Sequence, residues 1–385
     1  MVEAVRSGQS LRAVARQFGV SPATVQHWVR HAGDKPLEQV GWEDGSHLPH
    51  QVPNKTSPEI EQRVLQVRRF LSQHSDLGEW GAHAIQNYLQ EQGDPSIPSM
   101  ATINRILSRN GVFDGGQRVR RKPPVPGWYL PDVADKTAEI DETDFVEGLF
   151  LEGGEELFVL NTISLHGGLC ASWVSSQQKT EVVLACLQAH WQAHGLPTYA
   201  QFDNGNVFAG PHQHPDAVGR VIALCLGLGV TPVFAVPREF GIQSAIESYN
   251  NRWQQKVWQR FTFTQMSQVQ ACSTRYVAAV RNKYRQRQET APPRRAFPTH
   301  WEPPTQIPRQ GKIVFLRRTT GASEVEVLGH TYPLAVAWYH RLVRCEVDLV
   351  ANKIQVYGLR RAEPQSQPLL TQWDYRLPDW GTKRS

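Results

Sequence analysis

Three acidic residues, Asp141, Asp203 and Glu247, stand in segments that could bring them together in space. Asp141 lies in a predicted strand at 137–145, and Asp203 ends a predicted strand at 198–203, before a turn-forming Asn-Gly pair. Glu247 lies near the start of a helix-like segment. Carboxylates are hard ligands that suit Mg²⁺. Two such ions can activate a water or a 3′-hydroxyl and stabilise in-line attack on a phosphate, so we expect phosphodiester chemistry here.

Asp141 is not the only acid in its predicted strand, because Glu139, Glu142 and Asp144 compete with it. Side chains alternate across a strand, so Glu139 and Asp141 share one face while Glu142 and Asp144 point to the other. Alternation alone does not choose between the faces. We favour Asp141 on the resemblance described below, with Asp144 as the second candidate.

Residues 1–33 predict a helix-turn-helix DNA-binding domain. Gly19 can adopt the positive φ of the turn, Ser21 is a suitable N-cap, and Pro22 fits the first helical position. The alternative is an ordinary helical hairpin. The second helix would present polar residues to a major groove, and we name Thr24, Gln26, His27 and Arg30.

Linkers separate the next helical unit from its neighbours. Residues 34–55 form a linker with several Pro and Gly, and residues 56–113 predict a second helix-turn-helix-like domain of three short helices. Residues 114–131 are a basic Pro-rich linker, which cannot be helical because its prolines remove hydrogen-bond donors. An extended basic segment can follow a phosphate backbone. Its candidate DNA contacts are Arg118, Arg120, Arg121 and Lys122.

The remaining segments predict a catalytic core and two basic C-terminal parts. Residues 132–268 show three strands in a meander and then alternating helices and strands, which indicates a mixed sheet with flanking helices. Residues 269–304 predict a basic helix and linker, and residues 305–385 predict a small β-barrel domain. The candidate DNA contacts are Arg252 and Lys256 in the core, Arg281, Lys283, Arg285 and Arg287 in the basic helix, and Arg317, Arg318, Arg341 and Arg344 in the barrel.

Composition excludes several classes of protein. The formal net charge of +5 combines an acidic middle with basic ends, which suits a metal-dependent core between polyanion-binding arms. The five cysteines are scattered without a CxxC pair, which argues against a zinc cluster or a disulfide framework. The sequence has neither a long apolar run nor a GxxxxGK[ST] motif, so we expect no membrane span and no nucleotide cofactor.

Three segments carry a family resemblance. Residues 201–208 (QFDNGNVF) resemble the second-aspartate motif of retroviral-integrase-like enzymes, residues 243–250 (QSAIESYN) the segment around their glutamate, and residues 140–143 (IDET) their first-aspartate strand. With the helical N-terminal modules, the chain resembles bacterial insertion-sequence transposases of the DDE class. Two departures are a longer segment between Asp203 and Glu247 and Ser244, where many relatives have Gly.

The resemblance implies a multidomain fold: all-α helix-turn-helix modules, a central α/β ribonuclease-H-like core with a mixed sheet, and the C-terminal barrel. It implies that Asp141, Asp203 and Glu247 hold two Mg²⁺ ions, with Mn²⁺ as a substitute.

The implied activity is that of a transposase. Such an enzyme binds the inverted-repeat ends of a mobile element, cleaves them and transfers the 3′ strands into target DNA. The implied partners are DNA and further copies of the chain, at least a dimer, in the bacterial cytoplasm at the nucleoid. The open alternatives are a catalytically inactive DNA-binding regulator and a ribonuclease-H-like nuclease or resolvase without strand joining.

Overall fold

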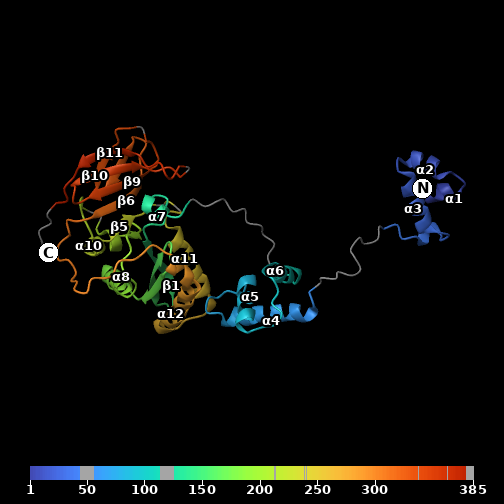
Figure 1. Ribbon diagram of the computed structural model, residues 1–385, viewed down its shortest axis with the longest axis horizontal. Coiled ribbons are helices and arrows are strands. Elements are labelled where there is room, and N and C mark those ends of the chain that lie inside the picture. Colours follow the sequence, from blue (N-terminus) through green and yellow to red (C-terminus); the bar gives the residue numbers. More distant parts are fainter. Residues whose placement is uncertain are drawn as a thin grey trace. The chain divides into compact units, whose positions relative to one another are not determined.

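The computed structural model describes residues 1–43, 56–112, 125–211, 214–237, 239, 241–336, 338–361 and 363–378. The chain forms two compact units, Met1–Ser57 and Pro58–Ser385 (Figure 1). Among these described residues, no helix is both long and apolar enough to span a membrane.

The first unit contains the helices that the sequence predicts. The Oγ atom of Ser21 accepts a hydrogen bond from the Thr24 N–H at 3.1 Å, and Pro22 is the first helical residue after it. Gly19 ends the preceding helix at φ 66°, a conformation that costs glycine no steric strain. Val14 and Val25 are buried between the two helices. The helices are α1 (Val2–Arg6), α2 (Leu11–Phe18) and α3 (Pro22–Ala32), followed by a 3₁₀ turn at Leu37–Gln39.

The second unit begins with three short helices, close to the predicted segments. The expected apolar stripe of the first helix, Val64, Val67 and Leu71, is buried against the other two. Ser99 caps the third helix, with its Oγ accepting from the Thr102 N–H. The helices are α4 (Pro58–His74), α5 (Ala82–Glu91) and α6 (Met100–Arg109).

The centre of the second unit is a nine-stranded mixed sheet in the order β11-β10-β9-β6-β5-β4-β1-β2-β3. β1, β2 and β3 form the predicted antiparallel meander, and β4 and β5 run parallel to β1. The strands are β1 (Ile140–Phe150), β2 (Glu156–Ser164), β3 (Cys170–Ser175), β4 (Tyr199–Phe202), β5 (Thr231–Phe234), β6 (Lys312–Arg318), β9 (Leu342–Asp348), β10 (Lys353–Gly358) and β11 (Leu369–Asp374).

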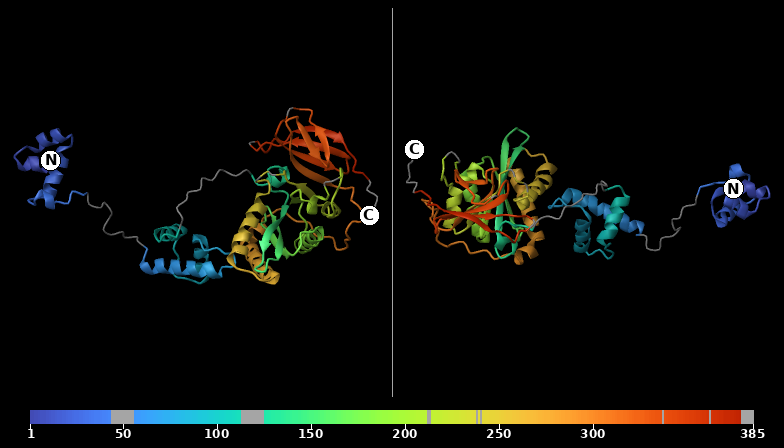
Figure 2. Two further views of the ribbon diagram at one scale, coloured as in Figure 1. Left: turned by 180° about the vertical axis from the view of Figure 1, so that it is seen from behind. Right: turned by 90° about the horizontal axis from the view of Figure 1, so that it is seen from above.

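Helices cover both faces of this sheet (Figure 2). On one face, Phe145 of β1 packs with Leu187 and Trp191 of one helix and Val221 of another. On the opposite face, Val146 shares an apolar cluster with residues of a different helix pair. The first pair is α8 (Thr180–His194) and α10 (Arg220–Gly227); the second is α11 (Ser244–Lys256) and α12 (Met266–Lys283). Shorter helices are α7 (Pro131–Ala134), α9 (Asn206–Ala209) and α13 (Arg285–Glu289).

The C-terminal strands differ from the prediction of a separate barrel. β6 pairs in parallel with β5, with Phe315 opposite Phe234 and the two rings stacked at 5.3 Å. β9, β10 and β11 extend the same sheet outward, and only β7 (Glu324–Val327) and β8 (His330–Pro333) form a second, two-stranded sheet in the described part of the chain. The predicted strands exist, but hydrogen bonding to β5 joins them to the core.

This shared sheet makes a truncation test decisive. We expect removal of residues 312–385 to abolish cooperative unfolding, because β5 would lose its partner and Phe234 its ring contact. Removal of residues 1–57, a separate compact unit, should leave the main transition unchanged. Differential scanning calorimetry measures both. An intact main transition without residues 312–385 would show that the C-terminal strands fold independently.

Candidate functional site

The two faces of β1 carry different acids. Odd-numbered residues of β1 such as Phe145 face α8, and even-numbered residues such as Val146 face α11. Glu247 belongs to the first turn of α11. The face that could share a site with Glu247 is therefore the face of Glu142 and Asp144.

Strand register places Asp144 beside Asp203. β1 and β4 are parallel, with Glu142 opposite Gln201, so Asp144 comes level with Asp203 two residues further along. Burial, followed by the charge of Asp203, raises the pKa of Asp144 to about 7. The two carboxylates thus repel each other at the end of β4, where the backbone turns and the Gly205 N–H donates to Asp203 Oδ1 at 2.8 Å.

Asn250 connects this carboxylate pair to α11. Its Nδ2 donates to Asp144 Oδ2 at 2.9 Å, and its Oδ1 accepts from Asn161 Nδ2 at 2.8 Å. Glu247 lies three residues earlier, on the same side of the helix as Asn250, and is exposed. The contact of Asn250 therefore turns the Glu247 face of α11 toward Asp144 and Asp203.

Glu142 fixes the start of α11. It is buried, and its Oε2 accepts the Ile246 N–H at 2.9 Å, which satisfies a donor that the first turn of a helix leaves unpaired. Burial is the main reason that the pKa of Glu142 is raised to about 8, although the backbone donors lower it. A carboxyl group of β1 thus sets the position of the helix that carries Glu247.

These oxygen ligands suit Mg²⁺ or Mn²⁺ in type and in charge. A divalent cation between Asp144 and Asp203 would relieve the repulsion that raises the pKa of Asp144. Within the residues that the structure describes, no three His, Cys, Asp or Glu side chains are gathered closely enough to hold a metal ion. The exposed Glu247 side chain would have to turn inward to complete a three-carboxylate site.

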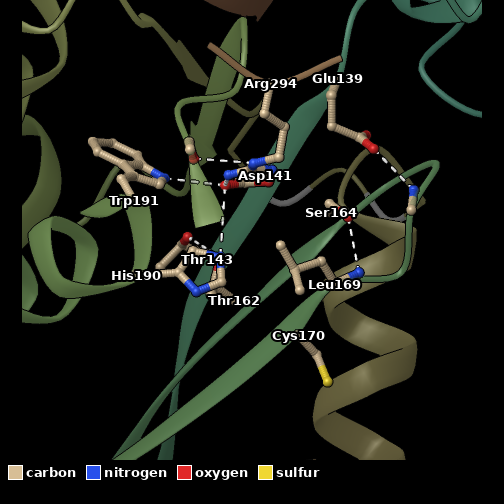
Figure 3. A network of polar contacts seen from close by, with 12 residues as sticks. Glu139, Asp141, Thr143, Thr162, Ser164, Leu169, Cys170, His190, Trp191 and Arg294 are labelled. Carbon is tan, nitrogen blue, oxygen red and sulfur yellow. Dashed lines mark hydrogen bonds and ion pairs between the residues drawn. The ribbon is translucent and has the colours of Figure 1, made fainter. Parts of the chain in front are cut away.

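Asp141 occupies a different environment, on the α8 face of β1 (Figure 3). It is fully buried, and Arg294 contacts both of its oxygens, at 2.8 and 2.7 Å. Trp191 Nε1 donates to Oδ2 at 3.1 Å. Although burial would raise the pKa of Asp141, the Arg294 guanidinium lowers it below the usual value. Both oxygens are occupied, which argues against the predicted role of Asp141 as a metal ligand.

Three of the four predicted cations of the basic helix also contact protein groups. Arg281 Nε donates to the Cys170 carbonyl at 2.7 Å, and Lys283 pairs with Glu79 at 2.6 Å. Arg287 donates to the carbonyls of Leu165 and His166. Arg281 and Arg287 hold α12 and α13 against the core, because their guanidinium groups satisfy carbonyls that the strand ends leave open. Lys283, Arg285 and Arg287 are nevertheless exposed, and Arg285 lies 3.6 Å from Glu289.

Some of the other predicted DNA contacts also touch protein groups, and others are exposed. Arg252 donates to the Tyr284 hydroxyl at 2.9 Å, and Lys256 lies over the Trp80 ring at 4.5 Å, so both contact protein. On α3, Gln26, His27 and Arg30 are exposed, while the half-buried Thr24 bonds Ser21. Arg118, Arg120, Arg121 and Lys122 lie outside the described residues.

Sequence reasoning missed Arg294 as the partner of Asp141. Alternation in β1 separates Asp141 from Asp144 in the sequence itself. The missing signal was which face α11 covers. The sequence of the strand carries no such signal, because Phe145 and Val146 on its two faces are both apolar.

No protein-family model matches the chain. Among solved structures, it is similar to a chain of the simian T-cell lymphotropic virus intasome in complex with PP2A regulatory subunit B56 gamma, with 12% identity and a TM-score of 0.35 over 68% of this chain and 84% of that one. It is also similar to the catalytic core domain of BIV integrase, with 16% identity and a TM-score of 0.30 over 39% of this chain and 96% of that one. Both TM-scores are too low to assign a function.

The ion pair of Asp141 and Arg294 predicts a large stability effect. We expect Arg294→Ala to lower the free energy of unfolding by about 3–5 kcal/mol, because it leaves a buried carboxylate without its partner. The exposed Arg285→Ala should change it by less than about 0.5 kcal/mol. Urea unfolding measures both. Equal effects of the two substitutions would contradict a structural role for the pair.

His190 predicts sensitivity to acid. Its ring is buried 4.0 Å from Asp141, and burial is the main cause that lowers its pKa to about 3. Above about pH 6.5, both folded and unfolded chains hold it neutral. As the pH falls below that value, His190 becomes protonated in the unfolded chain but stays neutral in the folded chain. Its contribution to stability therefore falls by about 1.4 kcal/mol per pH unit toward pH 3.

The variant His190→Phe should lose this contribution, so that its stability declines less steeply between about pH 6 and pH 4. The exposed His300→Gln serves as the control. Chemical unfolding at several pH values measures the slopes. A slope in His190→Phe as steep as in the parent chain would contradict the assignment.

Proposed function

We propose that the chain is a metal-dependent polynucleotidyl transferase, a transposase of DDE type, with Asp144, Asp203 and Glu247 as its carboxylates. This proposal replaces Asp141 by Asp144. The observation that carries it is the placement of Asp144 level with Asp203 on the sheet face covered by α11, the helix of Glu247. The mixed sheet with helices on both faces agrees with the ribonuclease-H-like core that the sequence resemblance implies.

In this mechanism, the three carboxylates would hold two Mg²⁺ ions, or Mn²⁺ in their place. When bound, such ions activate the attacking oxygen and stabilise charge on the phosphate. Asn250 orients Asp144 through its amide N–H, and Asn161 in turn fixes the amide of Asn250. Glu142 holds the first turn of α11 in place. The chain's own residues thus bind the ions and orient the carboxylates that hold them.

DNA recognition is assigned to the helical N-terminal units. α3 exposes Gln26, His27 and Arg30 on one side and is joined to α2 by a short turn, which suits insertion into a major groove. The substrate would be the inverted-repeat ends of a bacterial mobile element. The working species would be at least a dimer, because two ends must be held together.

The activity test compares two acids of one strand. Asp144→Asn should abolish Mg²⁺-dependent nicking and strand transfer on a labelled duplex carrying the DNA ends that flank the gene. Asn250→Ala should lower the rate about 10–100-fold, as loss of a residue that orients a metal ligand typically does. Asp141→Asn should retain activity per folded molecule, and the exposed Glu147→Gln is the matched control.

Binding of Mn²⁺, measured by calorimetry, should weaken in Asp144→Asn and persist in Asp141→Asn. The opposite result would show that Asp141, and not Asp144, is the metal ligand. Nicked products without joined ones would indicate a nuclease or resolvase. DNA binding without any metal-dependent cleavage would indicate a regulator.

A further inference from the structure

Arg317 differs from the other arginines at the C-terminal end of the sheet. Arg318 pairs with Glu239 at 2.5 Å, and Arg344 pairs with Glu346 at 2.8 Å. Arg317 makes no ion pair with any described residue: it donates to the Leu316 carbonyl at 2.9 Å and lies over the Phe315 ring at 4.9 Å.

The guanidinium of Arg317 is also poorly hydrated. Burial lowers the pKa of Arg317 despite the opposing influence of Cys345 and Glu326. A desolvated cation without a carboxylate partner is costly, and an anion that reaches it would be bound strongly for the same reason. The planar guanidinium fork matches two oxygens of a phosphate.

A cavity of about 100 Å³ adjoins this side chain. It extends between Arg317 and the turn after β4, where Asn204 follows Asp203. His214 and Glu326 complete its polar lining. The cavity thus adjoins Arg317 and the residue that follows Asp203 in the sequence.

Sheet geometry sets the distance between the two groups. β4, β5 and β6 are parallel neighbours, so their carboxyl ends meet at one edge of the sheet. Asp203 follows β4, and Arg317 lies at the end of β6, two strand spacings away. At about 4.8 Å per spacing, their Cα atoms are about 10 Å apart. The register places Arg317 on the sheet face of Phe315 and Asp203 on the face of Leu316. A phosphate at Arg317 would belong to a nucleotide near the one that reacts.

We propose that Arg317 forms a binding site for a backbone phosphate of the DNA strand next to the scissile phosphate. The proposal rests on the proposed function for the identity of its ligand. Arg317 would bind and position the DNA strand, and it would have no part in holding the metal ions.

A scan with single methylphosphonate linkages tests this site through binding alone. Each linkage removes the charge of one phosphate near the cleaved end, and affinity is measured for the full chain without cleavage. In the parent chain, a neutral linkage at one position next to the scissile phosphate should lower the affinity for DNA. In Arg317→Gln, the same position should have no further effect, because its partner is already absent.

Salt dependence gives an independent measurement. The slope of log affinity against log salt should fall by about 0.7–0.9 in Arg317→Gln, the value for one lost phosphate contact. Arg360→Gln, whose arginine is already paired with Glu363 at 3.1 Å, is the matched control and should change it less. An unchanged melting temperature would show that Arg317→Gln is folded.

The outcomes separate the two proposals. If the methylphosphonate linkages lower affinity at the same positions in the parent and in Arg317→Gln, and the salt slopes are equal, the phosphate site is wrong, even where cleavage is intact. Interference that depends on Arg317 would support the site even where no cleavage is found. If inorganic phosphate raises the melting temperature of the parent but not of Arg317→Gln, and the scan is flat, the site binds free phosphate and the DNA assignment is wrong.

Discussion

The structure depends on the burial of several carboxyl groups in one strand between two helical layers. β1 can bury these carboxyl groups only because each face of the strand supplies charged or hydrogen-bonding partners for them. On the α8 face, a guanidinium neutralises Asp141. On the α11 face, a helix N–H and an amide form hydrogen bonds to Glu142 and Asp144 but supply no positive charge. The acid of the first face therefore has its counter-charge within the protein, while burial raises the pKa of the acids on the second.

Much of this fold could be predicted from local sequence. The meander, the helix from Thr180 to His194 and the capped helix after Ser21 follow from apolar periodicity and end signals, and the structure contains them. The choice between Asp141 and Asp144 could not be predicted in this way. It depends on which helix covers which face, a long-range property that a motif of four residues does not contain. The predicted barrel was wrong for a similar reason, since the parallel pairing of β6 with β5 joins distant segments.

The C-terminal strands also anchor the loop that lengthens the segment between Asp203 and Glu247. Asp216 lies in this loop at φ 63°, and its N–H donates to the Leu328 carbonyl at 2.9 Å. Its carboxylate accepts from the Tyr375 hydroxyl at 2.6 Å and lies 2.9 Å from His330 Nε2. The unusual backbone conformation is held by contacts from the β7–β8 turn and from the residues after β11. The last part of the chain thereby supports the surroundings of Asp203.

The ion pair between Asp141 and Arg294 joins residues 153 positions apart. During translation, the first strand of the sheet leaves the ribosome long before its counter-charge has been synthesised. Until then, the nascent core contains an uncompensated carboxylate and lacks β6 beside β5. Completion of the fold must therefore wait for nearly the whole polypeptide. Premature termination would yield fragments that cannot assemble this core.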